Sequence, residues 1–108
     1  MAETDEIMQA ALRLQSAFEE LAVRGLRSAG PQQLGALEAL REEFERVGAG
    51  HLAGRVAAVI QGVRNDDRGA AAALLRAQAS LRVFERMLTL EVAGAVLERM
   101  LAPEEEDV

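Results

Sequence analysis

The stretch that decides the fold spans residues 51–63 and reads HLAGRVAAVIQGV. It is apolar on most sides of a helix and carries one firm charge, Arg55. A helix with so little polar surface is usually surrounded by other helices. We therefore predict that it is the central helix of a small all-helical domain. Small residues repeat at every fourth position, which favours a close backbone crossing with a neighbouring helix: Gly54, Ala58 and Gly62.

The composition agrees with a helical fold and excludes several kinds of chemistry. A chain of 108 residues is the size of one domain. Half of the residues are hydrophobic, with three Phe and no Trp or Tyr, so the core must consist mainly of Leu, Val, Ala and Met. Apolar and polar residues do not alternate over any useful length, so strands are not expected. The absence of cysteine excludes disulfides, thiolate catalysis and cysteine-ligated zinc.

Charge and hydropathy restrict the partners and the compartment. The net charge of −6 disfavours non-specific nucleic-acid binding, which depends on positive charge. The acidic start, residues 1–6, is unlike a secretory signal. No apolar run approaches the roughly 18 residues of a membrane span. We therefore expect a cytoplasmic protein that binds neither nucleic acid nor membrane.

Two helices are predicted before the central one. The first spans about Asp5 to Ala29, with Thr4 as its N-cap and Gly30 in the left-handed conformation at its end. Its apolar residues repeat in alternating steps of four and three: Ile7, Ala11, Leu14, Phe18, Leu21 and Gly25. The second begins at Pro31, which suits a first helical position, and ends at Gly48-Ala49-Gly50. Its predicted buried stripe is Leu34, Leu37, Leu40, Phe44 and Val47.

A fourth helix follows the turn at residues 64–67, where Asp66 or Asp67 is the predicted cap. It begins near Arg68 and could run to Ala102, just before Pro103. The alternative is a break between Thr89 and Gly94, because Thr89, Val92 and Gly94 lower helix propensity. Residues 1–103 then form one helical domain, and residues 104–108 form an acidic tail that we expect to be disordered.

The fourth helix carries two apolar seams. One seam is Leu74, Ala77, Leu81, Phe84 and Leu88. The other again has steps of four and three and consists of Val83, Met87, Leu90, Gly94, Leu97 and Leu101. Three partner helices can cover one seam, so the second needs a helix from another chain, unless the fourth helix breaks near Thr89 and folds back. We favour the intermolecular explanation. The predicted fold is all-α: an antiparallel four-helix bundle or helical-hairpin array with a long C-terminal helix.

The sequence offers few groups for catalysis or metal binding. His51 is the only histidine, and no cysteine, second histidine or Glu three residues before it completes a zinc or di-iron site. Glu91 lies between Leu90 and Val92, where it could reach the rim of an interface. The other carboxylates mostly fall on outer faces beside arginines. We predict no catalytic, metal or cofactor-binding residue and no cofactor.

The sequence pattern of residues 25–75 resembles that of a known helical segment. The similar positions are Gly25-Leu26, Leu37, Leu40, Gly48, Leu52-Ala53 and Leu74-Leu75. They resemble the helical segment of bacterial SWIM zinc-finger proteins, which occur beside MoxR-type AAA+ ATPases and von Willebrand A-domain proteins. The resemblance implies a stand-alone helical adaptor of a AAA+ ATPase system. The SWIM zinc motif is absent because the chain has no cysteine, so no zinc or DNA function is carried over.

The function predicted from the residues is that of a non-enzymatic adaptor or small subunit. It forms a homodimer or docks another helical protein through the second seam of the fourth helix, residues 83–101. The alternatives are a ligand-binding bundle, with a pocket between helices in which His51 and Glu91 meet, and a small subunit of a nucleoprotein complex.

Overall fold

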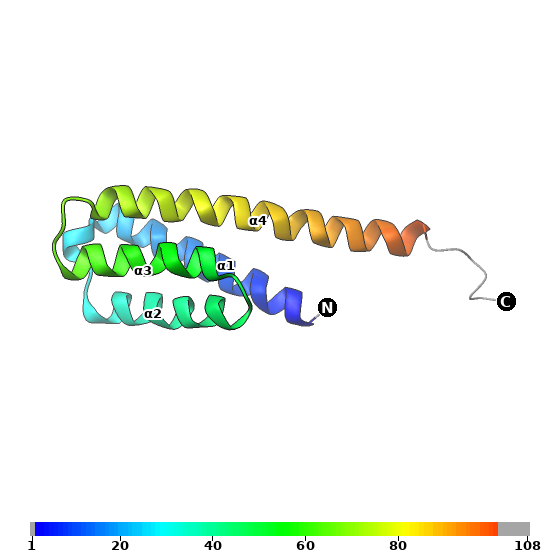
Figure 1. Cartoon of the computed structure of the whole chain (residues 1–108), viewed down its shortest axis with the longest axis horizontal. Helices are drawn as coiled ribbons and strands as arrows, with labels where there is room; N and C mark the ends of the chain where they lie inside the picture. Colours follow the sequence, from blue (N-terminus) through cyan, green and yellow to red (C-terminus); the bar gives the residue numbers. More distant parts are fainter. Residues whose placement is uncertain (1, 102–108) are drawn as a thin grey trace.

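The computed structural model describes residues 2–101, which form four α-helices and no strand (Figure 1). Helix α1 spans Ala2–Arg24, α2 Pro31–Arg46, α3 Gly50–Arg64 and α4 Ala70–Leu101, and a short 3-10 helix, η1, spans Leu26–Ser28. The predicted all-α class is confirmed. The predicted tail at residues 104–108 lies outside the described residues.

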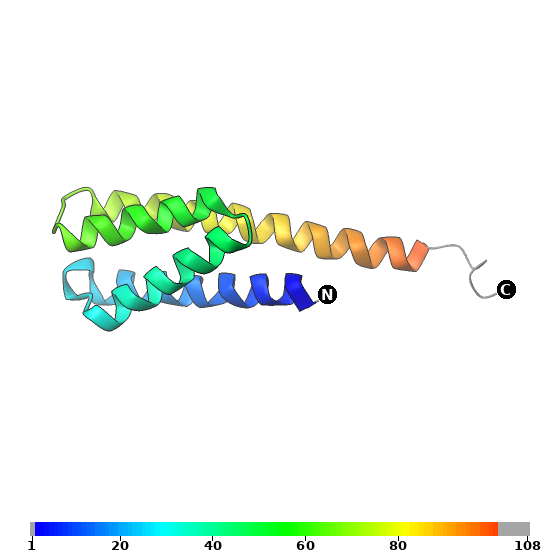
Figure 2. The same ribbon diagram turned by 60° about the horizontal axis from the view of Figure 1, so that its bottom comes forward.

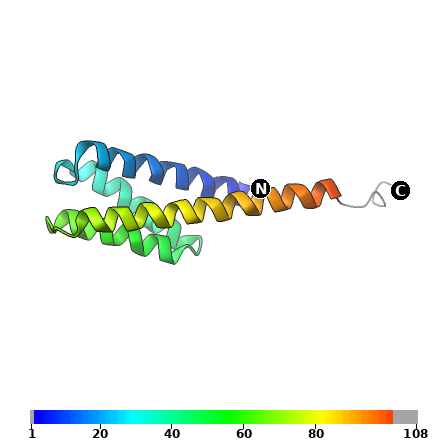
Figure 3. The ribbon, with the colours of Figure 1, turned by 90° about the horizontal axis from the view of Figure 1, so that it is seen from above.

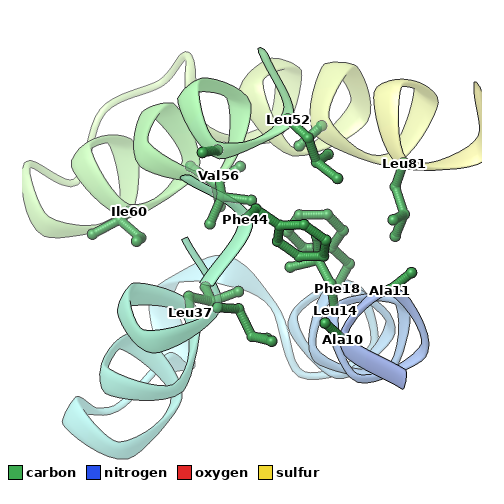
Figure 4. Packing of buried hydrophobic residues seen from close by; sticks show 14 of the residues in the cluster. Ala10, Ala11, Leu14, Phe18, Leu37, Phe44, Leu52, Val56, Ile60 and Leu81 are labelled. Atoms are coloured by element: carbon green, nitrogen blue, oxygen red, sulfur yellow. The ribbon is translucent and has the colours of Figure 1, made fainter. Parts of the chain in front are cut away.

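The helices pack around one hydrophobic core. Helix α2 packs against α1 and α3, and α4 also packs against α1 and α3. Figure 2 shows α2 crossing obliquely over the others, and Figure 4 shows the side chains that meet between them. The rings of Phe44 and Phe84 contact edge to face, with centroids 5.6 Å apart. The core draws on all four helices: Ala10, Ala11, Leu14, Phe18, Leu21, Leu37, Leu40, Phe44, Leu52, Ala53, Val56, Val59, Ile60, Leu74, Ala77, Leu81 and Leu88.

The end of α1 differs from the prediction. Helix α1 stops at Arg24, and Gly25 adopts a φ of +91°, a conformation that L side chains rarely take. Gly25 therefore ends the helix instead of continuing its apolar seam. Gly30, predicted to be left-handed, is extended and is the N-cap of α2, where its N–H donates to Gln33 Oε1 at 2.9 Å. Pro31 is the first residue of α2, as predicted.

Two further details of these helices were predicted wrongly. Thr4 lies inside α1, which already begins at Ala2, so Thr4 is not its N-cap. Val47 follows α2 and is exposed, because the helix ends at Arg46 and Gly48 turns the chain with a φ of +86°.

Helix α3 packs between α2 and α4, but it is not enclosed on all sides. Gly54 and Ala58 face solvent, and a Cβ added to Gly54 would meet nothing within 4 Å. The predicted close crossing is therefore wrong for Gly54 and Ala58. It is correct for Gly62, where an added Cβ would lie 3.0 Å from both Cα and Cβ of Ala70.

Helix α4 is continuous, which excludes the predicted alternative of a break near Thr89. Thr89 is accommodated because its hydroxyl donates to the carbonyl of Glu85 at 2.9 Å. The turn before α4 is held by Asp67, whose Oδ1 accepts the N–H of Gly69 at 2.8 Å. Gly69 is the residue immediately before α4, so neither Asp66 nor Asp67 is its N-cap, and Asp67 instead holds the turn that leads into the helix. At 32 residues, α4 is about 48 Å long, whereas α1 is about 35 Å.

Candidate interaction surface

Helix α4 presents two apolar faces that point in opposite directions. Three pairs of residues on it are nine positions apart: Leu74 and Val83, Leu81 and Leu90, Leu88 and Leu97. Nine residues make about two and a half helical turns, which places the members of each pair on opposite sides. The first member of each pair is buried in the core, and the second is exposed. Leu81 is 3% exposed, for example, and Leu90 is 66% exposed.

All six residues of the predicted second seam lie on the exposed face. We call them the α4 stripe: Val83, Met87, Leu90, Gly94, Leu97 and Leu101. The five large side chains of the α4 stripe are each between 55% and 73% exposed. An exposed apolar surface that runs along a helix is typical of a protein contact site. The structure thus places these residues together on one exposed face of α4.

Further apolar side chains of α4 are exposed beside the stripe. Leu75 lies towards the start of the helix, and Val96 and Met100 lie near its end. The sequence reading did not include them because they depart from the steps of four and three. The signal that could have found them is the number of apolar residues after Leu88, which occur on every side of the helix except the one that carries Glu91 and Glu98.

The last part of α4 extends beyond the other helices. The last buried residue of α4 is Leu88, and we call residues 89–101 the overhang. Figure 3 shows α4 continuing past the N-terminal end of α1. Thr4 and Asp5 of α1 still share a shallow groove with one side of the overhang, where Val92 and Ala95 are half-buried. The other sides of the overhang have no neighbour among the described residues.

The charged groups near the stripe are exposed and are distributed unevenly. Arg76, Arg82 and Arg86 lie before Leu88, and Glu91, Glu98 and Arg99 lie in the overhang. Half-buried Glu85 differs from these, because burial raises the pKa of its carboxyl above the ordinary value.

His51 and Glu91 are not brought together. His51 is exposed at the start of α3, where its Nε2 lies 3.5 Å from Oγ of Ser80. Glu91 lies eleven residues beyond Ser80 on the same continuous helix, a distance of about 16 Å. The expectation that His51 and Glu91 meet is therefore wrong, whereas a ligand-binding bundle with a different pocket stays a prediction. Within residues 2–101, no three His, Asp or Glu side chains are grouped so that they could hold a metal ion.

The remaining charges mostly form solvent-exposed ion pairs. Arg41 on α2 pairs with Glu38 and, at 2.9 Å, with Glu45. The hydrogen bond to Glu38 raises the pKa of Arg41, so this arginine stays charged. Arg13 of α1 reaches Glu43 of α2 at 3.2 Å. These pairs lie on the outer faces of α1 and α2, away from the α4 stripe, and contribute little to stability.

Comparison with protein-family models, with curated proteins and with solved structures found no match to this chain. Of the described helices, none combines the length and the apolar character that crossing a bilayer requires. The exposed face of α4 is therefore the feature of the described chain that bears most on its function.

Proposed function

We propose that this chain is a non-enzymatic helical interaction module, an adaptor or small subunit in the bacterial cytoplasm, that binds a helical partner through the α4 stripe. The observation that carries the proposal is the exposure of Val83, Met87, Leu90, Leu97 and Leu101 along one face of a continuous helix. The opposite face of the same helix is already covered by α1 and α3. A helix that is apolar on two faces is stable in water only when both are covered.

The helical packing supports the architecture that this function needs. Each of the four helices packs against two others, in the cycle α1, α2, α3, α4 and back to α1. We infer an antiparallel four-helix bundle with a long C-terminal helix. Such a bundle holds α4 as far as Leu88, so that Val83 and Met87, at the start of the α4 stripe, are displayed on a fixed support.

The size of the apolar surface fits a moderate association. Fully burying a Leu, Val or Met side chain contributes about 1.5–3 kcal/mol, and these five side chains have somewhat more than half of that still to gain. The stripe could therefore contribute about 5–9 kcal/mol from one partner. Association requires an estimated 4–15 kcal/mol in lost freedom of motion, so the stripe needs a partner with an apolar face of its own.

Two kinds of partner have such a face. One is a second copy of this chain. The other is a helical component of a MoxR-type AAA+ ATPase system, which the resemblance of residues 25–75 to SWIM-associated helical segments suggests.

The test is to place a charge in the middle of the stripe. Leu90→Glu puts a carboxylate at a central exposed position, and Thr89→Glu puts the same charge on the neighbouring residue, which is exposed but outside the stripe. We expect the unchanged chain and Thr89→Glu to have a light-scattering mass above the 11.6 kDa of one chain. Leu90→Glu should return the mass to that of one chain while circular dichroism retains most of the helicity.

The proposal would be overturned if Leu90→Glu abolished the cooperative unfolding transition. That result would mean that Leu90 belongs to the folding core and not to a contact surface. It would also be overturned if Thr89→Glu lowered the mass of an associated chain as much as Leu90→Glu does, since the effect would then come from charge alone.

A further inference from the structure

We infer that the partner of the α4 stripe is a second copy of this chain, and that the two α4 helices pack antiparallel. The inference rests on the proposed function and makes it specific. It is carried by two independent features of α4: the order of side-chain sizes along the stripe, and the distribution of charge along the helix.

The stripe is complementary to itself when one helix is reversed. In an antiparallel pair centred on position 92, Val83 faces Leu101 of the other copy, Met87 faces Leu97, and Leu90 faces Gly94. Every member of the stripe then has a partner, over a contact about 27 Å long. The space beside Gly94 is open, so it can receive the Leu90 side chain of the other copy. A parallel pair would instead place Gly94 opposite Gly94 and leave a gap.

The charges along α4 favour the same orientation. Within α4, residues 70–86 contain three arginines and one glutamate, a net charge of +2, whereas residues 87–101 contain two glutamates and one arginine, a net charge of −1. An antiparallel pair places the basic segment of each copy beside the acidic segment of the other. A parallel pair would gain exposed Arg86–Glu91 contacts between copies, but it would also bring two acidic segments together. Exposed charges contribute little in either arrangement, so charge adds only slightly to the preference, and the fit of Leu90 to Gly94 decides the orientation.

The fold allows this pairing without rearrangement. Helices α1 and α3 cover the face of α4 opposite to the stripe, so the two copies approach with their other helices turned outwards. The packed region already holds α4 up to Leu88, and only the overhang remains to be ordered by the second copy. Val83 and Met87 are thus preformed parts of the contact, whereas the four stripe residues from Leu90 to Leu101 become ordered on association, which costs conformational entropy.

The chain contains no cysteine, so single cysteines can report the orientation directly. We would introduce Met87→Cys and Leu97→Cys in separate, differently tagged full-length chains, both at exposed positions. In the antiparallel register Cys at 87 faces Cys at 97 of the other copy, whereas two identical cysteines lie about 15 Å apart along the axis. A disulfide requires Cα atoms within about 7 Å. Ala39→Cys, on the exposed side of α2, is the control variant, because any disulfide that it forms comes from random collision between chains.

We expect the mixed sample, oxidised with copper phenanthroline, to give roughly tenfold more heterodimer than either variant gives homodimer. Each homodimer should stay at the level of Ala39→Cys. Light scattering on the unchanged chain should give twice the 11.6 kDa of one chain.

Two results would overturn the inference. A Leu97→Cys homodimer well above the Ala39→Cys level would show a parallel pair, in which case the stripe is still a contact surface and the proposed function stands. A single-chain mass with no cross-link above the control would exclude the second copy as partner. The proposed function itself fails if Leu90→Glu unfolds the chain or if Thr89→Glu dissociates it as far as Leu90→Glu does, and neither result follows from a parallel pair or from a single-chain mass, so the two failures are distinguishable.

Discussion

The approach of α3 to α4 can be tested with one matched pair of substitutions. Gly54 and Gly62 both lie inside α3, and each can be changed to alanine. The gain in helix propensity from Gly to Ala is about 0.8–1 kcal/mol and is the same for both. The surroundings differ: an alanine Cβ at position 54 meets nothing within 4 Å, whereas at position 62 it lies 3.0 Å from the backbone Cα of Ala70.

The magnitudes follow from this difference. Gly54→Ala is expected to stabilise the chain by about 0.8–1 kcal/mol, which raises Tm by roughly 4 °C in a domain of this size. Gly62→Ala gains the same propensity but forces the start of α4 away. Overpacking of this kind costs about 1–3 kcal/mol, so the net effect lies between neutrality and a loss of about 2 kcal/mol. The difference between the two variants isolates the steric cost of about 1–3 kcal/mol.

Thermal and urea unfolding of the two variants at equal concentration measure this difference. If Gly62→Ala stabilises the chain as much as Gly54→Ala does, then α3 and α4 do not approach each other as closely as described. The comparison is insensitive to self-association, because neither glycine lies on α4.

Three further predictions concern α4. In a single chain, Leu81→Ala should lower the free energy of unfolding by about 2–5 kcal/mol, and Leu90→Ala by less than about 0.5 kcal/mol. Urea titration at high dilution measures both values. Equal losses would place Leu90 in the core. Gly94→Ala, made in the Leu90→Glu background, should slow amide hydrogen exchange in the overhang about four- to fivefold, because the added Cβ meets no atom within 4 Å and alanine has the higher helix propensity. Unchanged exchange would contradict a helical overhang that has open space at position 94. Glu85→Gln should stabilise the chain at pH 7 and have no effect at pH 3. The raised pKa means that the folded chain favours protonated Glu85. The stability that the neutral carboxyl allows is therefore fully present below the ordinary carboxyl pKa and is lost as the pH rises through the raised pKa of the folded chain. Equal effects of Glu85→Gln on thermal unfolding at pH 7 and pH 3 would refute this.

The sequence predicted what depends on apolar periodicity. Residues such as Phe18 and Phe44 are buried where the steps of three and four placed them, and the two seams of α4 lie on opposite faces. The period of the apolar residues indicates which side of a helix packs against other side chains, and that side stays the same when the predicted end of the helix is misplaced.

Choices between locally similar residues could not be predicted. Gly25 and Gly30 can both end a helix, and only the packing of α2 against α1 decides that the chain turns at Gly25. Gly54 and Gly62 have equal propensity, and only the place where α4 begins brings one of them against a backbone. The continuity of α4 is of the same kind, because the low propensities of Thr89, Val92 and Gly94 add up to little more than about 1–2 kcal/mol.

The overhang nevertheless has little in the described chain to stabilise it. A helix that is already nucleated extends by propagation, which favours each good helix former only slightly and is opposed here by Thr89, Val92 and Gly94. Beyond Leu88 no side chain is buried, so tertiary packing does not supply the difference. Covering the α4 stripe would supply it, because Leu90, Leu97 and Leu101 all lie in the overhang and on the stripe. Helicity of the overhang and association are therefore expected to be coupled, so that dilution lowers the mass and the helical signal over the same range of concentration.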